Sequence, residues 1–203
     1  MRLAIGTAHR ACSLALIDGS KVVKAVHEII GRGHAERLIP MIAALLGETR
    51  PGSIVVEIGP GSFTGMRVGI AAARALGVAW DVPVSGITST EVLAARAFRD
   101  HADLPEITVA LDGGRGEVFV QHFTRDGGET GPPAAVPAEQ AAIVGGAVIG
   151  TGTPMIVIPA HVRVLGTDMP DMADVAALIP PAGQDRPPAP LYVRAPDAKP
   201  PQR

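Results

Sequence analysis

The order of the expected secondary-structure elements constrains this fold more than any other feature of the sequence. Alternating apolar residues predict strands first, and the Asp18-Gly19 pair among them is a strong hairpin signal because both residues tolerate a positive φ. Strand and helix patterns then alternate. The expected strands are residues 2–5, 11–17, 21–29, 54–58 and 82–86, and the expected helices are residues 34–46, 67–80 and 89–99. Three antiparallel strands followed by such alternation predict an α/β protein with a mixed sheet.

A second set of elements begins after residue 104 and is richer in loops. The expected strands are residues 107–111, 117–123, 147–149 and 155–158, followed by a helix at residues 171–178. Of the 19 prolines, 14 lie between Pro132 and Pro201, and the stretch from Pro180 has the composition of an extended connector. We therefore expect two domains: a first lobe of residues 1–104, and a second, reduced and Pro/Gly-rich lobe of residues 105–203 with a C-terminal tail.

The charge content points toward a protein partner. Only 19% of the residues are charged, against a typical quarter, while 47% are hydrophobic. Part of the surface is therefore expected to face another protein. The net charge of -2, from 18 basic and 20 acidic residues, offers no general attraction to a polyanion, so any RNA would be held mainly by another subunit.

The sequence gives no sign of export or of a membrane span. Cys12 is the only cysteine, which excludes an intramolecular disulfide, and its strand pattern indicates a small buried residue. The start, MRLAIG, lacks the order of a signal peptide, and the longest weakly polar stretch, residues 68–80, is too short to cross a bilayer. We expect a cytoplasmic protein.

The most informative local segment is residues 59–67, GPGSFTGMR, between an expected strand and a helix. Backbone N–H groups can converge on an anion at such a place. However, Gly59, Gly61 and Gly65 do not have the spacing of a dinucleotide or P-loop motif, and Ser62 lacks the flanking glycines of a nucleophile elbow. A tight strand-to-helix connection with hydroxyl caps is the commoner structure.

The helix after this segment carries small residues four apart, at Ala71, Ala75 and Ala79, and so on one face. Such a face permits close helix approach. Two interpretations stay open: the face packs inside this chain, or part of it docks against a partner.

Candidate reactive groups are sparse. His34 and Glu36 are two residues apart and lie on different sides of a helix, so they cannot form a metal pair. We expect no metal site and no cofactor. Asp112, Arg115 and Glu117 flank a glycine-rich turn; they form either an acid–base or ion-pair set, or a solvated hairpin loop.

Several ordered segments together resemble one known family. They are residues 3–8 (LAIGTA), 11–16 (ACSLAL), 34–42 (HAERLIPMI), 59–69 (GPGSFTGMRVG), 86–89 (GITS), 112–119 (DGGRGEVF) and 191–194 (LYVR). In this order they are similar to the bacterial TsaB (YeaZ) family. The resemblance covers most of residues 1–123 and a short piece of the tail.

The resemblance implies an actin-like ATPase/sugar-kinase/Hsp70 (ribonuclease H-like) fold, with two lobes of mixed β-sheets flanked by helices, each on a β-β-β-α-β-α-β plan. It also implies a role in making threonylcarbamoyladenosine next to the anticodon of tRNA. In that pathway TsaC makes the threonylcarbamoyl adenylate, and the metal-bearing TsaD transfers the group to tRNA. TsaB is the non-catalytic paralogue of TsaD, and the ATPase TsaE joins the pair.

The resemblance further implies that first-lobe helices pack on TsaD, with tRNA contacted only indirectly. The preferred interface positions are Leu38, Met41, Ile42 and Leu45. The full set of expected partner-binding residues is His34, Glu36, Arg37, Leu38, Met41, Ile42, Leu45, Gly59, Gly61, Ser62, Phe63, Thr64, Gly65, Arg67, Ala71 and Ala75.

One position departs from the family pattern. Gly6 stands at the end of the first strand, where family members commonly have Asp and kinase-like relatives use an acid near the nucleotide. Nucleotide hydrolysis by this chain alone is therefore not expected, and no catalytic residue is assigned. Two alternatives to a scaffold subunit stay open: a glycoprotease-like (M22-type) hydrolase, and a free-standing homodimer that uses the same helices.

Overall fold

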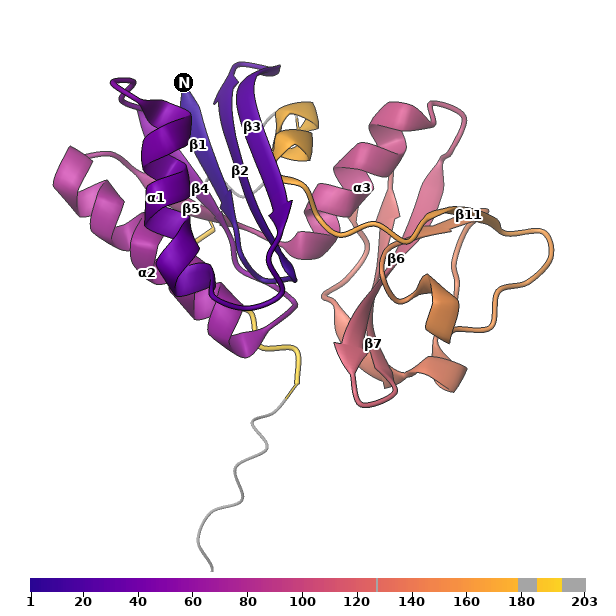
Figure 1. Cartoon of the computed structure of the whole chain (residues 1–203). Helices are drawn as coiled ribbons and strands as arrows, with labels where there is room; N and C mark the ends of the chain where they lie inside the picture. Colours follow the sequence, from indigo (N-terminus) through magenta and orange to yellow (C-terminus); the bar gives the residue numbers. More distant parts are fainter. Residues whose placement is uncertain (127, 179–185, 195–203) are drawn as a thin grey trace, which may run out of the picture.

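The computed structural model describes residues 1–126, 128–178 and 186–194, and these form two β-sheets, each in its own lobe (Figure 1). The first sheet has the strand order β3-β2-β1-β4-β5. Its strands are β1 (Arg2–Gly6), β2 (Ala11–Asp18), β3 (Lys21–Ile29), β4 (Ser53–Glu57) and β5 (Val84–Ile87). Strand β1 pairs antiparallel with β2 and parallel with β4, so the sheet is mixed, as predicted.

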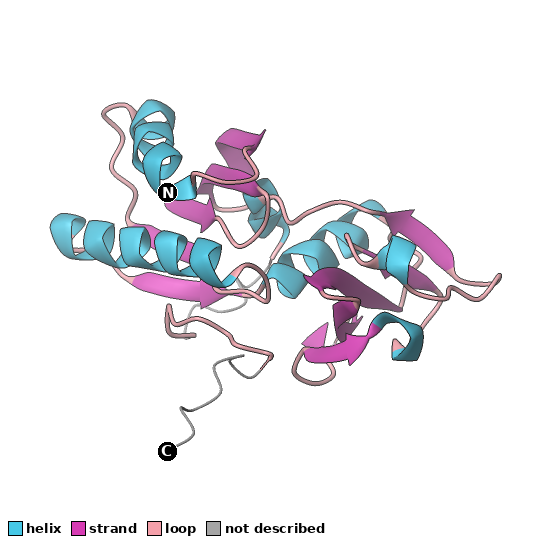
Figure 2. Ribbon diagram, turned by 60° about the horizontal axis from the view of Figure 1, so that its bottom comes forward, coloured by secondary structure: helices cyan, strands magenta, loops and turns pink. Residues whose placement is uncertain are grey.

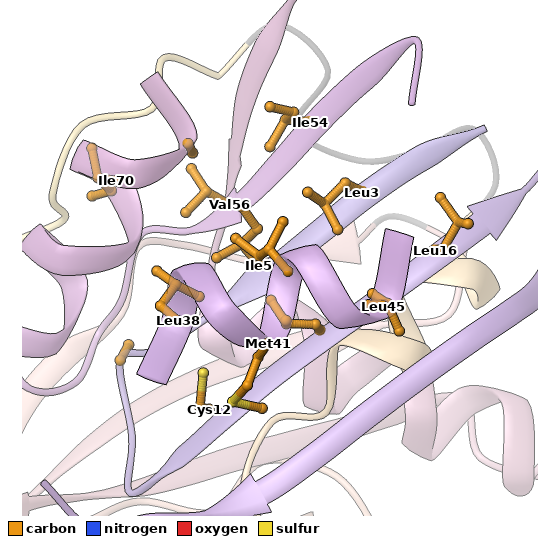
Figure 3. Close-up of a cluster of buried hydrophobic side chains, with 14 of the residues drawn as sticks. Leu3, Ile5, Cys12, Leu16, Leu38, Met41, Leu45, Ile54, Val56 and Ile70 are labelled. Carbon is orange, nitrogen blue, oxygen red and sulfur yellow. The ribbon is translucent and has the colours of Figure 1, made fainter. Parts of the chain in front are cut away.

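Helices α1 (His34–Leu46) and α2 (Phe63–Trp80) pack side by side on one face of this sheet (Figure 1). Apolar residues of α1 repeat at helical spacing, and Gly47 ends the helix with a φ of 56°. The resulting core contains side chains from β1, β2, β4 and both helices (Figure 3). Cys12 lies buried within it, as predicted.

The second sheet repeats the plan of the first, but without its long helices. The strands are β6 (Glu106–Gly114), β7 (Glu117–Thr124), β8 (Gly128–Glu129), β9 (Ala134–Pro137), β10 (Ala147–Ile149) and β11 (Arg163–Gly166). Strand β7 pairs antiparallel with β6 and β9, while β10 lies parallel to β6 and β11. Where the first lobe has α1 and α2, the described residues of the second lobe form the short 3₁₀ turns η1 (Ala138–Gln140) and η2 (Thr153–Met155) (Figure 2).

The two lobes exchange one element each. Helix α3 (Ser89–Asp100) follows the first sheet but contributes Leu93 and Ala97 to the core of the second. Conversely, the 3₁₀ helix η3 (Met172–Ala177) follows the second sheet and covers the free face of the first, where Met172 and Val175 are buried. The division of the chain at residue 104 stays a prediction, because these elements cross it.

Most element positions agree with the sequence, with several corrections. Residues 155–158 are not a strand, because Thr153-Pro154 starts a 3₁₀ turn and the chain then runs irregularly. The helix expected at residues 171–178 is the 3₁₀ helix η3, capped by Asp171, which accepts from the Ala173 N–H. Strands β8, β9 and β11 were not predicted. The connector expected from Pro180 falls largely outside the described residues.

The arrangement of two lobes with mixed sheets flanked by helices confirms the predicted actin-like fold class. Among the residues that the structure describes, no helix is long and apolar enough to cross a membrane.

Candidate partner surface and interlobe cleft

Helix α2 begins at Phe63, four residues earlier than predicted, because the glycine–serine segment itself provides the cap. Ser62 is the N-cap residue, and its Oγ accepts a hydrogen bond of 3.2 Å from the Gly65 N–H. A hydroxyl-capped connection was the commoner structure expected from the sequence, and the structure confirms it.

The glycines of this segment allow it to lie against the β1–β2 turn. A Cβ on Gly61 would collide with the Ala8 carbonyl oxygen, and one on Gly65 would collide with the Thr7 carbonyl oxygen. Ser62 N–H donates to Ala8 O at 2.7 Å, and Thr7 Oγ1 donates to Gly65 O at 2.8 Å. Gly59 and Gly65 are buried, so their prediction as partner-binding residues is wrong: both are packed inside this chain.

The outer face of α2 is exposed along its whole length. Phe63, Arg67, Ala71 and Ala75 lie four residues apart on it, and all are exposed. Near the other end of the helix Val78 is 85% exposed. Ala71 and Ala75 therefore do not pack inside this chain, and their docking against a partner stays a prediction.

An aromatic cluster stands at the start of this face. The rings of Phe63 and Tyr192 stack with centroids 5.4 Å apart and planes at 27°. The Arg67 guanidinium lies 3.8 Å from the Phe63 centroid, and its Nε donates to Tyr192 Oη at 2.9 Å. Both rings are about half exposed, at 52% for Phe63 and 45% for Tyr192. Exposed Tyr and Arg side chains are typical of the centres of protein interfaces.

Helix α1 turns its predicted interface residues inward, which corrects the sequence-based assignment. Four of them pack in the core of the first lobe, with 1 to 8% of their surface exposed (Figure 3). They are Leu38, Met41, Ile42 and Leu45. His34 is also buried, with Nε2 3.2 Å from the Ala11 carbonyl oxygen. The helical spacing was predicted correctly, but the apolar face of α1 packs against the sheet of this chain rather than against a partner.

The exposed face of α1 is formed by other residues. Ile39 is 50% exposed, and Pro40, Ala43 and Ala44 are exposed beside it. Glu36 and Arg37 are exposed as predicted, and Arg37 pairs with Glu28 of β3 at 2.7 Å. The exposed residues of α1 and the outer face of α2 are here called the α1–α2 face.

A cleft of about 740 Å³ lies between the lobes. Its first-lobe wall includes His9, Arg10 and Ser62, and its second-lobe wall includes Asp112 and Thr151. The pKa of His9 is lowered by burial, which outweighs the opposing influence of the neighbouring Glu57 carboxylate. This His9–Glu57 pair joins residues far apart in the sequence and was not predicted.

Glu57 is held by the protein on both of its oxygens. Ser89 Oγ donates to Oε1 at 2.7 Å, the Ala8 N–H donates to Oε2 at 2.9 Å, and His9 Nε2 lies 3.5 Å from Oε1. The carboxylate is 2% exposed. It therefore joins the ends of β1 and β4 to the start of α3, and each of its oxygens accepts a hydrogen bond from this chain.

The glycine-rich turn forms the β6–β7 hairpin. Arg115 has a φ of 60°, and Asp112 Oδ1 accepts from the Gly114 N–H at 2.7 Å. Glu117 pairs at 2.7 Å with Arg194 from the end of the described chain. The sequence left two interpretations open, and the structure shows a hairpin turn in which Glu117 is ion-paired with Arg194.

Other candidate reactive groups are held in structural roles. Burial raises the pKa of the Cys12 thiol to about 11, so it is not a nucleophile at neutral pH. Within residues 1–126, 128–178 and 186–194, no group of three or more His, Cys, Asp or Glu side chains is placed to hold a metal ion.

Comparison with known proteins identifies the family. The family model described as tRNA N6-adenosine threonylcarbamoyltransferase (TsaD) matches residues 24–149. The protein TsaB of Escherichia coli, described as a tRNA threonylcarbamoyladenosine biosynthesis protein, is 36% identical over 132 residues. The structure of YeaZ from Pseudomonas aeruginosa superposes with a TM-score of 0.76 and 26% identity, covering 94% of this chain and 98% of that one. The chain belongs to the TsaB (YeaZ) family.

The extent of the match differs among relatives. The alignment with E. coli TsaB covers 61% of this chain and 55% of that protein, so the chain matches about half of that relative's length. An uncharacterized protein of Mycobacterium tuberculosis is 32% identical over 205 residues, covering 98% of this chain and 93% of its own length. A second P. aeruginosa structure, with a TM-score of 0.77 and 26% identity over 95% of this chain and 99% of that one, is described as similar to the peptidase YEAZ.

Two contacts of the C-terminal segment were missed by sequence reasoning. Tyr192 is the only tyrosine, and with Arg194 it lies in the segment LYVR that carried part of the family resemblance. A single tyrosine within a proline-rich tail was a signal from which a contact of this segment with the rest of the chain was predictable. Nothing in the local sequence, however, indicated that Tyr192 stacks on Phe63 or that Arg194 reaches Glu117.

Proposed function

We propose that this chain is a non-catalytic scaffold subunit that pairs with a TsaD-type catalytic subunit and activates it. The pair, joined by a TsaE-type ATPase, transfers threonylcarbamoyl to the adenosine next to the anticodon of tRNA. Membership of the TsaB family supports the pathway, since named relatives take part in threonylcarbamoyladenosine biosynthesis. The net charge of -2 is in keeping with tRNA being held mainly by other subunits.

The exposed α1–α2 face is the single observation that carries the pairing. Ile39, Phe63 and Val78 are each at least half exposed on it, and Ala71 and Ala75 provide the small surface that a packed helix needs. Arg67 and Arg74 are the charged residues on the exposed side of α2. The proposed interface therefore keeps Glu36, Arg37, Ser62, Phe63, Thr64, Arg67, Ala71 and Ala75 of the positions expected from the sequence.

The non-catalytic role is supported by how the candidate reactive groups are used. Ser62 Oγ caps α2, the Cys12 thiol is buried, and both Glu57 oxygens accept hydrogen bonds from this chain. Ser62 and Glu57 therefore have hydrogen-bond partners within this chain, and the Cys12 thiol is enclosed in its core.

Co-elution tests the proposal. Purified chain and the TsaD-type subunit of the same organism are expected to leave a size-exclusion column as one complex, in the presence or absence of nucleotide. Separate elution under every nucleotide condition would refute the pairing.

A hydrolase is the second candidate, favoured by the description of one structural relative as similar to a peptidase. Metal analysis of the pure protein separates the two: stoichiometric zinc or iron supports a metal-dependent hydrolase and contradicts the scaffold. A homodimer through the α1–α2 face would compete with the TsaD-type subunit, and light scattering with and without that subunit detects the competition.

A further inference from the structure

The last described segment of the chain crosses from one lobe to the other within four residues. It lies beside the lower end of α2 in Figure 1, in yellow. Leu191 belongs to the first lobe: its N–H donates to Ile58 O at 2.8 Å, and its side chain packs against the first core. Val193 belongs to the second lobe, where it packs against the core formed by α3, β6, β7 and β10.

Between these two anchors, Tyr192 contacts the α1–α2 face. Its ring stacks on Phe63, and its hydroxyl accepts from Arg67. The segment therefore contributes to the same exposed surface that is proposed to bind the partner.

Arg194 completes the crossing on the second-lobe side. Its guanidinium donates to Gly113 O at 2.7 Å, pairs with Glu117 at 2.7 Å, and lies 5.9 Å from the Phe119 ring centroid. Gly113 and Phe119 also line the interlobe cleft, opposite Ser62 and Gly65. A change in the separation of the lobes would pull Arg194 away from the hairpin or Tyr192 away from α2.

We propose that residues 191–194 form a latch that fixes the separation of the two lobes and couples it to partner docking on α2. A partner that packs on Phe63 and Tyr192 holds the latch in place, and thereby the β6–β7 hairpin across the cleft. The coupling to a partner rests on the proposed function, whereas the latch itself does not.

Spin-label distances test the latch in the full chain. Labels at Glu48→Cys, after α1, and Glu139→Cys, in η1, report the separation of the lobes from two exposed positions. The buried Cys12 thiol, whose pKa is raised, is expected to stay unlabelled. The otherwise native chain should give one narrow distance distribution, and Tyr192→Ala and Arg194→Ala should each broaden it.

Arg163→Ala is the matched control, because it removes an exposed ion pair of 2.5 Å with Asp103 that does not involve the latch. It should leave the distribution unchanged. If Tyr192→Ala impairs folding, Tyr192→Phe keeps the stack and removes only the hydroxyl, and Arg194→Gln removes only the charge; both should broaden the distribution to a smaller degree. If every variant at Tyr192 and Arg194 gave the same distance distribution as the chain with the native latch, the latch proposal would be wrong.

Partner affinity tests the coupling. Arg194 lies on the second lobe, yet Arg194→Ala is expected to weaken binding of the TsaD-type subunit about fivefold or more, while Arg163→Ala leaves it unchanged. Unchanged affinity in Arg194→Ala would overturn the coupling. If the wild-type chain binds no such subunit, the proposed function fails and the coupling with it, whereas the spin-label distances still decide the latch.

Discussion

Glu57 Oε2 lies 3.1 Å from the point at which a side chain on Gly6 would begin. The Met172 Cγ atom is closer still, at 2.9 Å from that point. The space beside Gly6 is therefore filled in this chain by the Met172 side chain and by a carboxylate from the neighbouring strand. Gly6 is the residue that allows both to be there.

Replacing Gly6 is expected to destabilise the fold, and a charged side chain at this position should destabilise it more than an uncharged one. Gly6→Asp places a second buried carboxylate against Glu57 and should lower the free energy of unfolding by about 3 kcal/mol or more. Gly6→Ala requires that Met172 shifts and that Glu57 moves slightly, and should cost about 1–2 kcal/mol. Denaturant unfolding measures both.

Met172→Ala in each background separates the two causes. Relative to Met172→Ala alone, which itself leaves a cavity, Gly6→Ala should cost less than it does in the wild type because the steric conflict is removed, whereas Gly6→Asp should cost nearly as much as in the wild type. Equal stabilities of the Asp and Ala variants would contradict this account of position 6.

The two sides of α1 are expected to respond differently to the same substitution. Met41 is 8% exposed in the first core, so Met41→Glu should cost about 3 kcal/mol or more in unfolding free energy. Ile39 is 50% exposed, so Ile39→Glu should change it by less than about 0.5 kcal/mol. Thermal unfolding compares them, and a Met41→Glu chain as stable as the wild type would show that Met41 is not a core residue.

Stability is expected to fall as the pH drops below neutral. Burial lowers the pKa of His9 and of His122 in the folded chain, so the unfolded chain takes up protons first as the pH falls through about 6.5. Each proton bound preferentially by the unfolded state weakens the fold. Asp174, whose pKa is raised by burial, acts in the opposite direction at lower pH.

Urea unfolding at about pH 7.5 and about pH 5.5 measures this dependence. The wild-type free energy of unfolding should be smaller at the lower pH, and His9→Gln should reduce the difference between the two values. A free energy that stays constant or rises toward the lower pH would contradict the lowered pKa values of these histidines in the folded chain.

Local signals predicted much of the first lobe. The bounds of β3 and α1 match the sequence because Asp18-Gly19 and Gly47 set them locally. The start of α2 was missed because Gly65, a typical loop residue, is a helical residue packed against Thr7. The strand expected at residues 155–158 was wrong because a short apolar run has no period that separates a strand from an irregular segment, and Val157 is in fact 79% exposed.

The sequence predicted which residues of the candidate surface share a helix face, but not which faces are exposed. Spacing shows that residues share a helix face, but it does not show whether that face meets the sheet or the solvent. For α1 the apolar residues met the sheet, and Ile39 was left exposed; for α2 the small residues Ala71 and Ala75 were left exposed. The contacts of His9 with Glu57 and of Phe63 with Tyr192 join distant parts of the chain and leave no local trace.

The affinity of the TsaD-type subunit for Ala71→Arg tests the central claim most directly. Ala71 is exposed, so the variant should stay folded, and an arginine there should weaken binding at least about tenfold by blocking close helix approach. Ala160→Arg, the same substitution at an exposed position of the second lobe, is the control and should bind like the wild type. A folded Ala71→Arg chain with wild-type affinity would contradict pairing through the α1–α2 face.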